Sequence, residues 1–174
     1  MKYEKINHYY SRMLQEIAFK TKASFGKPTY VILLLTNRCN AQCLHCHSWK
    51  LGSVDEELTT NDWHSVINQL RKWLGPIYIA ITGGEILLRN DAIQLAEHCS
   101  SLGFSTEFLT NGSLLKSEQA RQLIQSGVKR ITISLDGSNP EKHNLIRGRR
   151  GFFERVTESL RMLVHEKAER GAFH

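Results

Sequence analysis

The chain has 174 residues, of which 41% are hydrophobic and 23% are charged, and its formal net charge at pH 7 is +6. This composition fits one globular domain, and no apolar run approaches the roughly 20 residues that span a bilayer, which excludes a transmembrane helix. The basic excess predicts an affinity for anions, but the bases are scattered apart from Arg147-Gly148-Arg149-Arg150. We therefore expect neither a nucleic-acid partner nor a membrane partner.

Residues 1–10 are polar and carry no signal-peptide pattern, so we expect a cytoplasmic protein. Three of the four cysteines lie close together in the sequence. Clustered thiols in a cytosolic protein are metal ligands more often than disulfides. The fourth cysteine, Cys99, lies in an apolar helical pattern, and we interpret it as a core residue.

One helix and then four strand–helix pairs are predicted along the chain. Apolar residues recur at helical spacing from Tyr3 to Ile17, so residues 1–25 are interpreted as a helical extension that covers one end of the fold. Strands are predicted at residues 30–35, 77–81, 104–109 and 130–135, and helices after them at residues 59–74, 90–102, 117–124 and 152–164. The first strand is a continuous apolar run, which predicts burial on both faces.

This alternation predicts the α/β class, with parallel strands joined by right-handed crossovers. Both a doubly wound sheet and a part of a barrel satisfy the pattern. In either fold the carboxyl ends of the strands face the active site, so the residues that follow the strands are the first candidates for function.

Three cysteines follow the first strand. Cys39, Cys43 and Cys46 have the spacing C-x₃-C-x₂-C, and three thiolates at this range can hold an iron–sulfur cluster. A cubane cluster has four irons, so three cysteines leave one iron open to a small molecule. Zinc is the alternative, because His45 and His47 stand among the cysteines and zinc accepts both ligand types. A structural zinc site usually has a second pair of ligands, and the sequence offers none.

The loops after the other strands also carry candidate binding residues. They are Gly83, Gly84 and Glu85 after the second strand, Asn111 after the third, Ser134 inside the end of the fourth, and Arg147 in a later loop. Glycine lets the backbone approach a ligand closely, Glu85 can accept a hydrogen bond from an ammonium group, and Arg147 can hold a carboxylate through two hydrogen bonds. Each residue alone also fits an ordinary turn or a surface charge.

Together, these motifs resemble those of the radical SAM superfamily. The cysteine motif after the first strand and Gly83-Gly84-Glu85 after the second are similar to its two signatures, and the resemblance runs from about Tyr30 to the end of the chain. It implies a partial (β/α) barrel, or partial TIM barrel. It also implies a [4Fe–4S] cluster on Cys39, Cys43 and Cys46, whose open iron binds S-adenosylmethionine (SAM) through its amino and carboxylate groups.

The resemblance further implies a reaction and its partners. One electron from the reduced cluster cleaves SAM to methionine and a 5′-deoxyadenosyl radical, which abstracts hydrogen from a substrate. A reductant such as flavodoxin or ferredoxin is an implied partner. The implied SAM-binding residues are Gly83, Gly84 and Glu85 at the amino end, Ser134 and Arg147 at the ribose or carboxylate, and Asn111 as a further contact.

Other motifs resemble the SPASM/twitch branch, which includes maturases of peptides and cofactor precursors. They are Thr110-Asn111-Gly112, Ile133-Ser134-Leu135-Asp136-Gly137, His143, Ile146-Arg147-Gly148 and Gly151-Phe152-Phe153. A peptide or a cofactor precursor is therefore the expected substrate. Two residues depart from the family pattern, His45 at a position that is commonly aromatic and Ile86 at one that is usually proline. Neither departure removes a ligand.

The family's usual core has six βα units, and this sequence contains about four. We therefore expect residues 26–174 to be a radical SAM core that stops before the fifth and sixth units, as a fragment or as a chain that needs a partner to close its pocket. Two alternatives stay open. One is a non-catalytic module that binds an iron–sulfur cluster or zinc, and the other is an RNA-modifying radical SAM enzyme.

Overall fold

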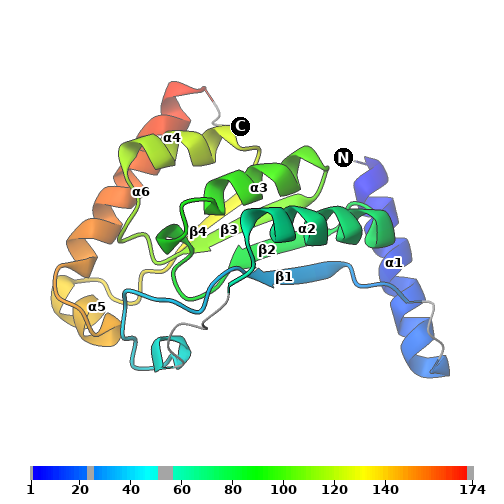
Figure 1. The fold of residues 1–174 in the computed structure, drawn as a ribbon, viewed down its shortest axis with the longest axis horizontal. Helices are drawn as coiled ribbons and strands as arrows, with labels where there is room; N and C mark the ends of the chain where they lie inside the picture. The colour runs from blue at the N-terminus through cyan, green and yellow to red at the C-terminus, as the bar shows by residue number, and fades with distance from the viewer. Residues whose placement is uncertain (1, 23–25, 51–56, 172–174) are drawn as a thin grey trace.

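The protein is described by a computed structural model that covers residues 2–22, 26–50 and 57–171. Its elements follow one another from helix α1 to helix α6 (Figure 1). The strands are β1 Tyr30–Leu34, β2 Tyr78–Thr82, β3 Ser105–Thr110 and β4 Arg130–Ile133. The helices are α1 Lys2–Thr21, α2 Thr60–Leu74, α3 Ala92–Ser101, α4 Ser117–Gln125, α5 Pro140–Arg147 and α6 Phe152–Glu169, with single turns η1 at Ser48–Lys50 and η2 at Ile86–Leu88.

The four strands form one parallel sheet in the order β1-β2-β3-β4, so strands that are consecutive in the sequence are neighbours in the sheet. Residues that pair across neighbouring strands, such as Ile32 with Ala80 and Ala80 with Glu107, form rows that cross the sheet. Helices α2, α3 and α4 lie along one face (Figure 1). The predicted α/β class, with its four strand–helix pairs, is confirmed.

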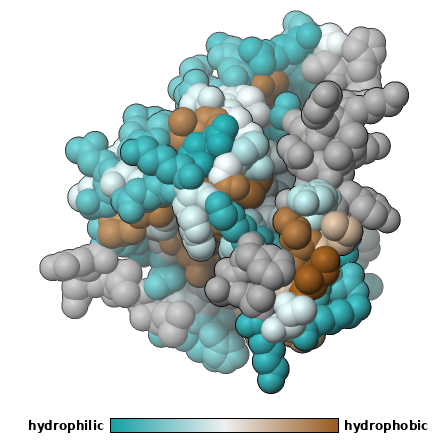
Figure 2. Space-filling model, turned by 90° about the vertical axis from the view of Figure 1, so that its right-hand side faces the viewer, coloured by the Kyte–Doolittle hydropathy of each residue, from teal (hydrophilic) through white to brown (hydrophobic). Residues whose placement is uncertain are grey.

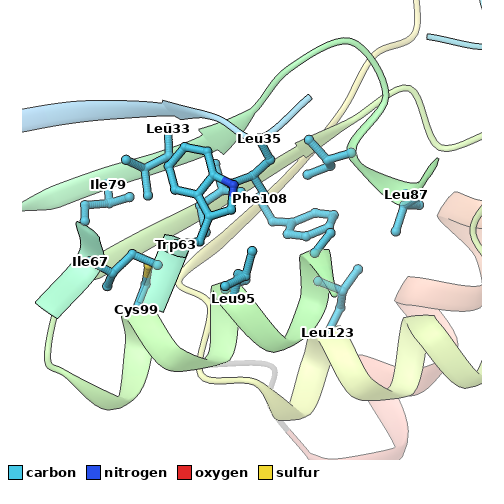
Figure 3. Packing of buried hydrophobic residues seen from close by; sticks show 14 of the residues in the cluster. Leu33, Leu35, Trp63, Ile67, Ile79, Leu87, Leu95, Cys99, Phe108 and Leu123 are labelled. Atoms are coloured by element: carbon cyan, nitrogen blue, oxygen red, sulfur yellow. The ribbon is translucent and has the colours of Figure 1, made fainter. Parts of the chain in front are cut away.

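The hydrophobic core lies between the sheet and these helices (Figure 3). Leu33 and Phe108 project from β1 and β3, and Ile67 and Leu95 meet them from α2 and α3. Cys99 is fully buried in the same cluster, as its helical context predicts. This core fixes the strands, and thereby the loops at their carboxyl ends.

Capping residues determine where the helices begin and end. Thr59 accepts a hydrogen bond from the Asp62 N–H, and the Asp62 carboxylate accepts one from the Thr59 N–H, which is the reciprocal pair of a capping box. Helix α5 begins after Asn139, whose side chain accepts from the Lys142 N–H, and it ends at Gly148 in the left-handed conformation. The sequence analysis missed α5, although both of its caps are visible in the sequence.

The inner face of the sheet is open, so the prediction that the first strand is buried on both faces is wrong. Tyr30, Ile32 and Leu34 are 48%, 53% and 61% exposed, whereas Leu33 is buried against the helices. Within the described residues, β1 is an edge strand, and about half of each of these three residues is open to solvent. The apolar run therefore combines one core face with one open face.

Helix α1 lies at the end of the sheet where the strands begin (Figure 1). Ala18 is buried, with its side chain near Gly26, but Met13 and Ile17 of the predicted stripe are exposed. Figure 2 faces this end of the molecule and shows apolar surface among polar residues. Helix α1 falls within the predicted extension of residues 1–25, of which residues 1 and 23–25 lie outside the described part. None of the described helices is long and apolar enough to cross a membrane.

A hydrogen-bonded carboxylate stands on the open face. Glu107 accepts hydrogen bonds from the hydroxyl groups of Tyr78 and Thr132, each at 2.5 Å. The Tyr30 ring stacks on Tyr78, with the ring centroids 5.2 Å apart. Burial and the hydrogen bond to Glu107 raise the pKa of Tyr78 to about 12.

Two isoleucine substitutions distinguish the two faces of the sheet. Ile81 is fully buried, and Ile81→Ala is expected to lower the free energy of unfolding by about 2–5 kcal/mol because it leaves a cavity. Ile32→Ala on the open face is the matched control and is expected to change it by less than about 1 kcal/mol. Urea unfolding followed by circular dichroism measures both values. If the two variants lost the same free energy of unfolding, the assignment of Ile32 to an open face would be wrong.

Glu107→Gln is expected to lower the pKa of Tyr78 from about 12 toward the ordinary value near 10. The folded chain holds the Tyr78 proton more tightly than the unfolded chain. This contribution to stability is therefore complete below pH ~10 and is lost as the pH rises toward 12. Ultraviolet titration of the tyrosines compares the variant with the parent, and Glu118→Gln on exposed α4 surface is the control. If Glu107→Gln titrates at alkaline pH like the parent, Glu107 does not raise the pKa of Tyr78.

Candidate functional site

A cavity of about 410 Å³ opens at the carboxyl ends of the strands. Its volume lies in the range of small-molecule sites. The predicted site residues that line it are Cys39, Cys43, Cys46, Gly83, Gly84, Asn111, Ser134 and Arg147. Ser134 lies just after β4 rather than inside the strand. Of the predicted set, Glu85 alone is absent from the lining among the described residues.

Gly84 brings the turn after β2 against the segment that leads to the cysteines. Its N–H donates to Thr36 O at 2.7 Å, and the Glu85 N–H donates to Arg38 O at 2.8 Å. A Cβ atom at Gly84 would overlap Arg38 O, and one at Gly83 would overlap Thr36 O. Only glycine fits at this separation, so the two loops lie backbone against backbone, with Gly83 and Gly84 lining the cavity.

The Glu85 carboxylate is fully buried and faces protein groups. It accepts hydrogen bonds from the Thr110 hydroxyl at 2.6 Å, the Asn111 N–H at 2.7 Å and the Leu87 N–H at 3.0 Å. Burial raises the pKa of Glu85, and the three hydrogen bonds oppose that rise. In this arrangement the carboxylate connects the turn after β2 to the end of β3 and orients Asn111.

Asn111 belongs to a group of three side chains that joins the β3 loop to the cysteine loop. Its Nδ2 donates to Asn40 Oδ1 at 2.8 Å, and Asn40 Nδ2 donates to Ser113 Oγ at 2.9 Å. The Ser113 hydroxyl donates back to Asn111 Oδ1 at 2.7 Å. Sequence reasoning missed Asn40 and Ser113, because nothing in the local sequence marks a contact between residues 73 positions apart.

Arg147 is the last residue of α5 and is only 8% exposed, so the prediction of a loop position is wrong. Its main-chain O accepts a hydrogen bond from the Gln42 N–H at 2.9 Å. Its Nη1 lies 3.4 Å from Cys43 Sγ, and its Nε lies 2.5 Å from Asp136 Oδ2. The guanidinium therefore joins the cysteine loop to the loop after β4.

Comparison with known proteins places the chain in a family. A model described as the radical SAM superfamily matches residues 33–170. The chain belongs to the radical SAM superfamily. This finding confirms the resemblance seen in the motifs and supports an enzyme.

Two curated radical SAM relatives cover most of this chain. The AdoMet-dependent heme synthase of Methanosarcina barkeri is 36% identical over 142 residues, which are 81% of this chain and 40% of that protein. The PqqA peptide cyclase of Bradyrhizobium diazoefficiens is 34% identical over 118 residues, which are 67% of this chain and 31% of that protein. The chain thus spans less than half the length of these relatives.

Solved structures agree on the fold. Native anSMEcpe with bound AdoMet superposes with a TM-score of 0.65 at 22% identity, over 79% of this chain and 41% of that one. Streptococcus suis SuiB bound to precursor peptide SuiA superposes with a TM-score of 0.67 at 20% identity, over 80% of this chain and 31% of that one. The predicted radical SAM partial barrel is therefore confirmed as the fold class.

The three cysteines of this radical SAM chain line the same cavity. Among residues 2–22, 26–50 and 57–171, no three His, Cys, Asp or Glu side chains are grouped to hold one metal ion. A cubane cluster takes each thiolate on a different iron, so its ligands stand farther apart than those of one zinc ion. Three thiols at one cavity are the donor type that an iron–sulfur cluster takes.

The thiols have unequal surroundings. Burial raises the pKa of Cys39. The hydroxyl and N–H of Ser48 lower the pKa of Cys46, and this N–H lies 3.4 Å from the sulfur. Cys46 is therefore more readily deprotonated than Cys39, and the loop offers non-equivalent ligands.

A charged network supports the same loops, and sequence reasoning did not foresee it. Glu57 pairs with Arg38 at 3.1 Å and with Arg89 at 3.3 Å, and Arg89 also pairs with Asp91 at 2.7 Å. The Thr36 hydroxyl donates to Glu57 as well. The Arg89 side chain is largely buried, so these pairs are screened less than surface pairs. The network ties the start of the cysteine loop to the start of α3.

Gly84→Ala is expected to push the two loops apart, because the added methyl group overlaps Arg38 O. The N–H groups of residues 84 and 85 donate across this contact, and we expect their hydrogen exchange to accelerate about tenfold. Gly151→Ala is the control, because its Cβ would meet nothing within 4 Å and only its φ of 75° would be strained. Parent-like protection of residues 84 and 85 in Gly84→Ala would refute the close approach.

Proposed function

We propose that this chain binds a [4Fe–4S] cluster through Cys39, Cys43 and Cys46, and that it binds SAM beside the cluster. The observation that carries the proposal is the single cavity that the three cysteines share with Gly83 and Gly84. A bound cluster would supply the one electron that breaks the bond between the SAM sulfur and C5′, so that methionine leaves and the 5′-deoxyadenosyl group can take a hydrogen atom from the substrate. The anSMEcpe structure with bound AdoMet supports SAM as the ligand.

In this proposal the chain's own residues position the ligand. The N–H groups of Gly84 and Glu85 are engaged by the cysteine-bearing segment, so carbonyl groups of the same turn are left to accept hydrogen bonds from the ammonium end of SAM. Ser134 and Asn111 line the cavity and offer hydrogen-bonding groups to the ribose or carboxylate.

We infer a peptide or a cofactor precursor as the substrate. The relative named PqqA peptide cyclase and the complex of SuiB with precursor peptide SuiA support a peptide. The relative named heme synthase supports a cofactor precursor. The proposal also includes a one-electron reductant such as flavodoxin or ferredoxin, and a cytoplasmic location.

The open inner face favours a second candidate, a module that binds a cluster without catalysis. Ile32 and Leu34 are exposed on this face. A highly reactive radical needs an enclosed site, because it would otherwise react with water or buffer. The two candidates differ in product formation and not in cluster binding.

Anaerobic reconstitution with iron and sulfide is expected to give the absorbance of a [4Fe–4S] cluster. Reduction with added SAM is expected to release methionine and 5′-deoxyadenosine. Cys43→Ala should lose both properties because it removes a ligand, whereas Cys99→Ala should keep both because Cys99 lies in the core. A Cys43→Ala variant that behaves like the parent would refute the ligand assignment. A parent chain that holds the cluster but forms no products would favour the non-catalytic module.

A further inference from the structure

We propose that Arg147 raises the reduction potential of the cluster by donating a hydrogen bond to the Cys43 thiolate. The inference rests on the proposed function and concerns the same site. From the sequence, Arg147 is expected at the ribose or carboxylate of the bound ligand. In the structure its guanidinium contacts the Cys43 sulfur, which is a cluster ligand in the proposed function.

Main-chain hydrogen bonds hold Arg147 beside the cysteine loop. The Gln42 N–H donates to Arg147 O, and the Leu44 N–H donates to the preceding carbonyl, each at 2.9 Å. Both neighbours of Cys43 are therefore tied to the end of α5. Gly148 follows with a φ of 63°, and a side chain at this position would overlap Gln42 O. The main chain at Arg147 cannot move away from the cysteine loop without breaking these contacts.

Two partners hold the guanidinium itself. Nη1 lies 3.4 Å from Cys43 Sγ, and Nε lies 2.5 Å from Asp136 Oδ2. Asp136 is anchored in turn, because its N–H donates to His143 Nδ1 at 3.1 Å. The Arg147 side chain is 9% exposed and that of Asp136 is 28% exposed. A permanently charged group in this position is screened less than one at the surface.

A cationic donor at a thiolate favours the reduced cluster. Reduction adds one negative charge, part of which resides on the ligand sulfurs. A positive charge and an N–H group at the sulfur stabilise that state more than the oxidised one. Hydrogen bonds to the sulfurs and net charge are among the factors that set cluster potentials. Within the described residues, Arg147 is the only cationic side chain that donates to any of the three sulfurs.

The experiment measures the midpoint potential of the reconstituted cluster, by redox titration followed by electron paramagnetic resonance, without SAM. Arg147→Gln is expected to lower the potential, by about 59 mV for each tenfold loss of preference for the reduced form. Asp136→Asn removes the carboxylate that offsets the guanidinium and is expected to raise the potential. Arg150→Gln removes the same charge from an exposed neighbour and is expected to leave the potential unchanged.

Omitting SAM separates the two roles of Arg147. If the arginine serves only to bind SAM, Arg147→Gln will have the parent potential without SAM and a shift only with SAM, and the proposal is wrong. If Arg147→Gln takes up no cluster, Asp136→Asn decides, because it leaves the arginine in place and removes only the charge that offsets it. A raised potential in Asp136→Asn supports the proposal, and an unchanged one overturns it. A parent chain that takes up no cluster refutes the proposed function, and this inference with it.

Discussion

Main-chain hydrogen bonds between the cysteine loop and two other loops are the constraint on which the site depends. Gly84 donates to Thr36 O on one side, and Gln42 donates to Arg147 O on the other. Because these contacts join backbone to backbone, the cysteines are positioned by the sheet and by α5 rather than by their own side chains. The glycines at both contacts follow from this requirement, since a Cβ atom would separate the segments.

This construction couples ligand binding to the stability of the fold. The three thiolates belong to one loop, but that loop is bonded to residues after β2, after β3 and at the end of α5. A group held by the thiolates in the folded chain adds its binding free energy to the stability of all these connections. Loss of the group and loss of a loop contact should therefore have similar structural consequences.

The strand–helix alternation was sufficient to predict the parallel sheet, and the position of residues after strands was sufficient to predict most of the cavity lining. The count of only four βα units was sufficient to predict an open inner face. The apolar run Tyr30–Leu34 pointed the other way, because such a run has the same pattern whether one face or both are covered. The contacts of the Arg147 side chain could not be predicted either, because Cys43 is distant from it in the sequence and Asp136 lies in another loop. The caps of α5 were visible in the sequence, and attention to Asn139 and Gly148 would have revealed that helix.

The carboxylate of Glu107 has a consequence for whatever covers the open face. Tyr78 and Thr132 already donate to its two oxygens, and Arg130 is its register neighbour in β4. Removing a carboxylate from water costs less free energy when hydrogen-bond donors already contact its oxygens than when it has none. A covering segment or substrate therefore needs no donor of its own at this point. The inner face can accept an apolar surface even though it contains a charge at its centre.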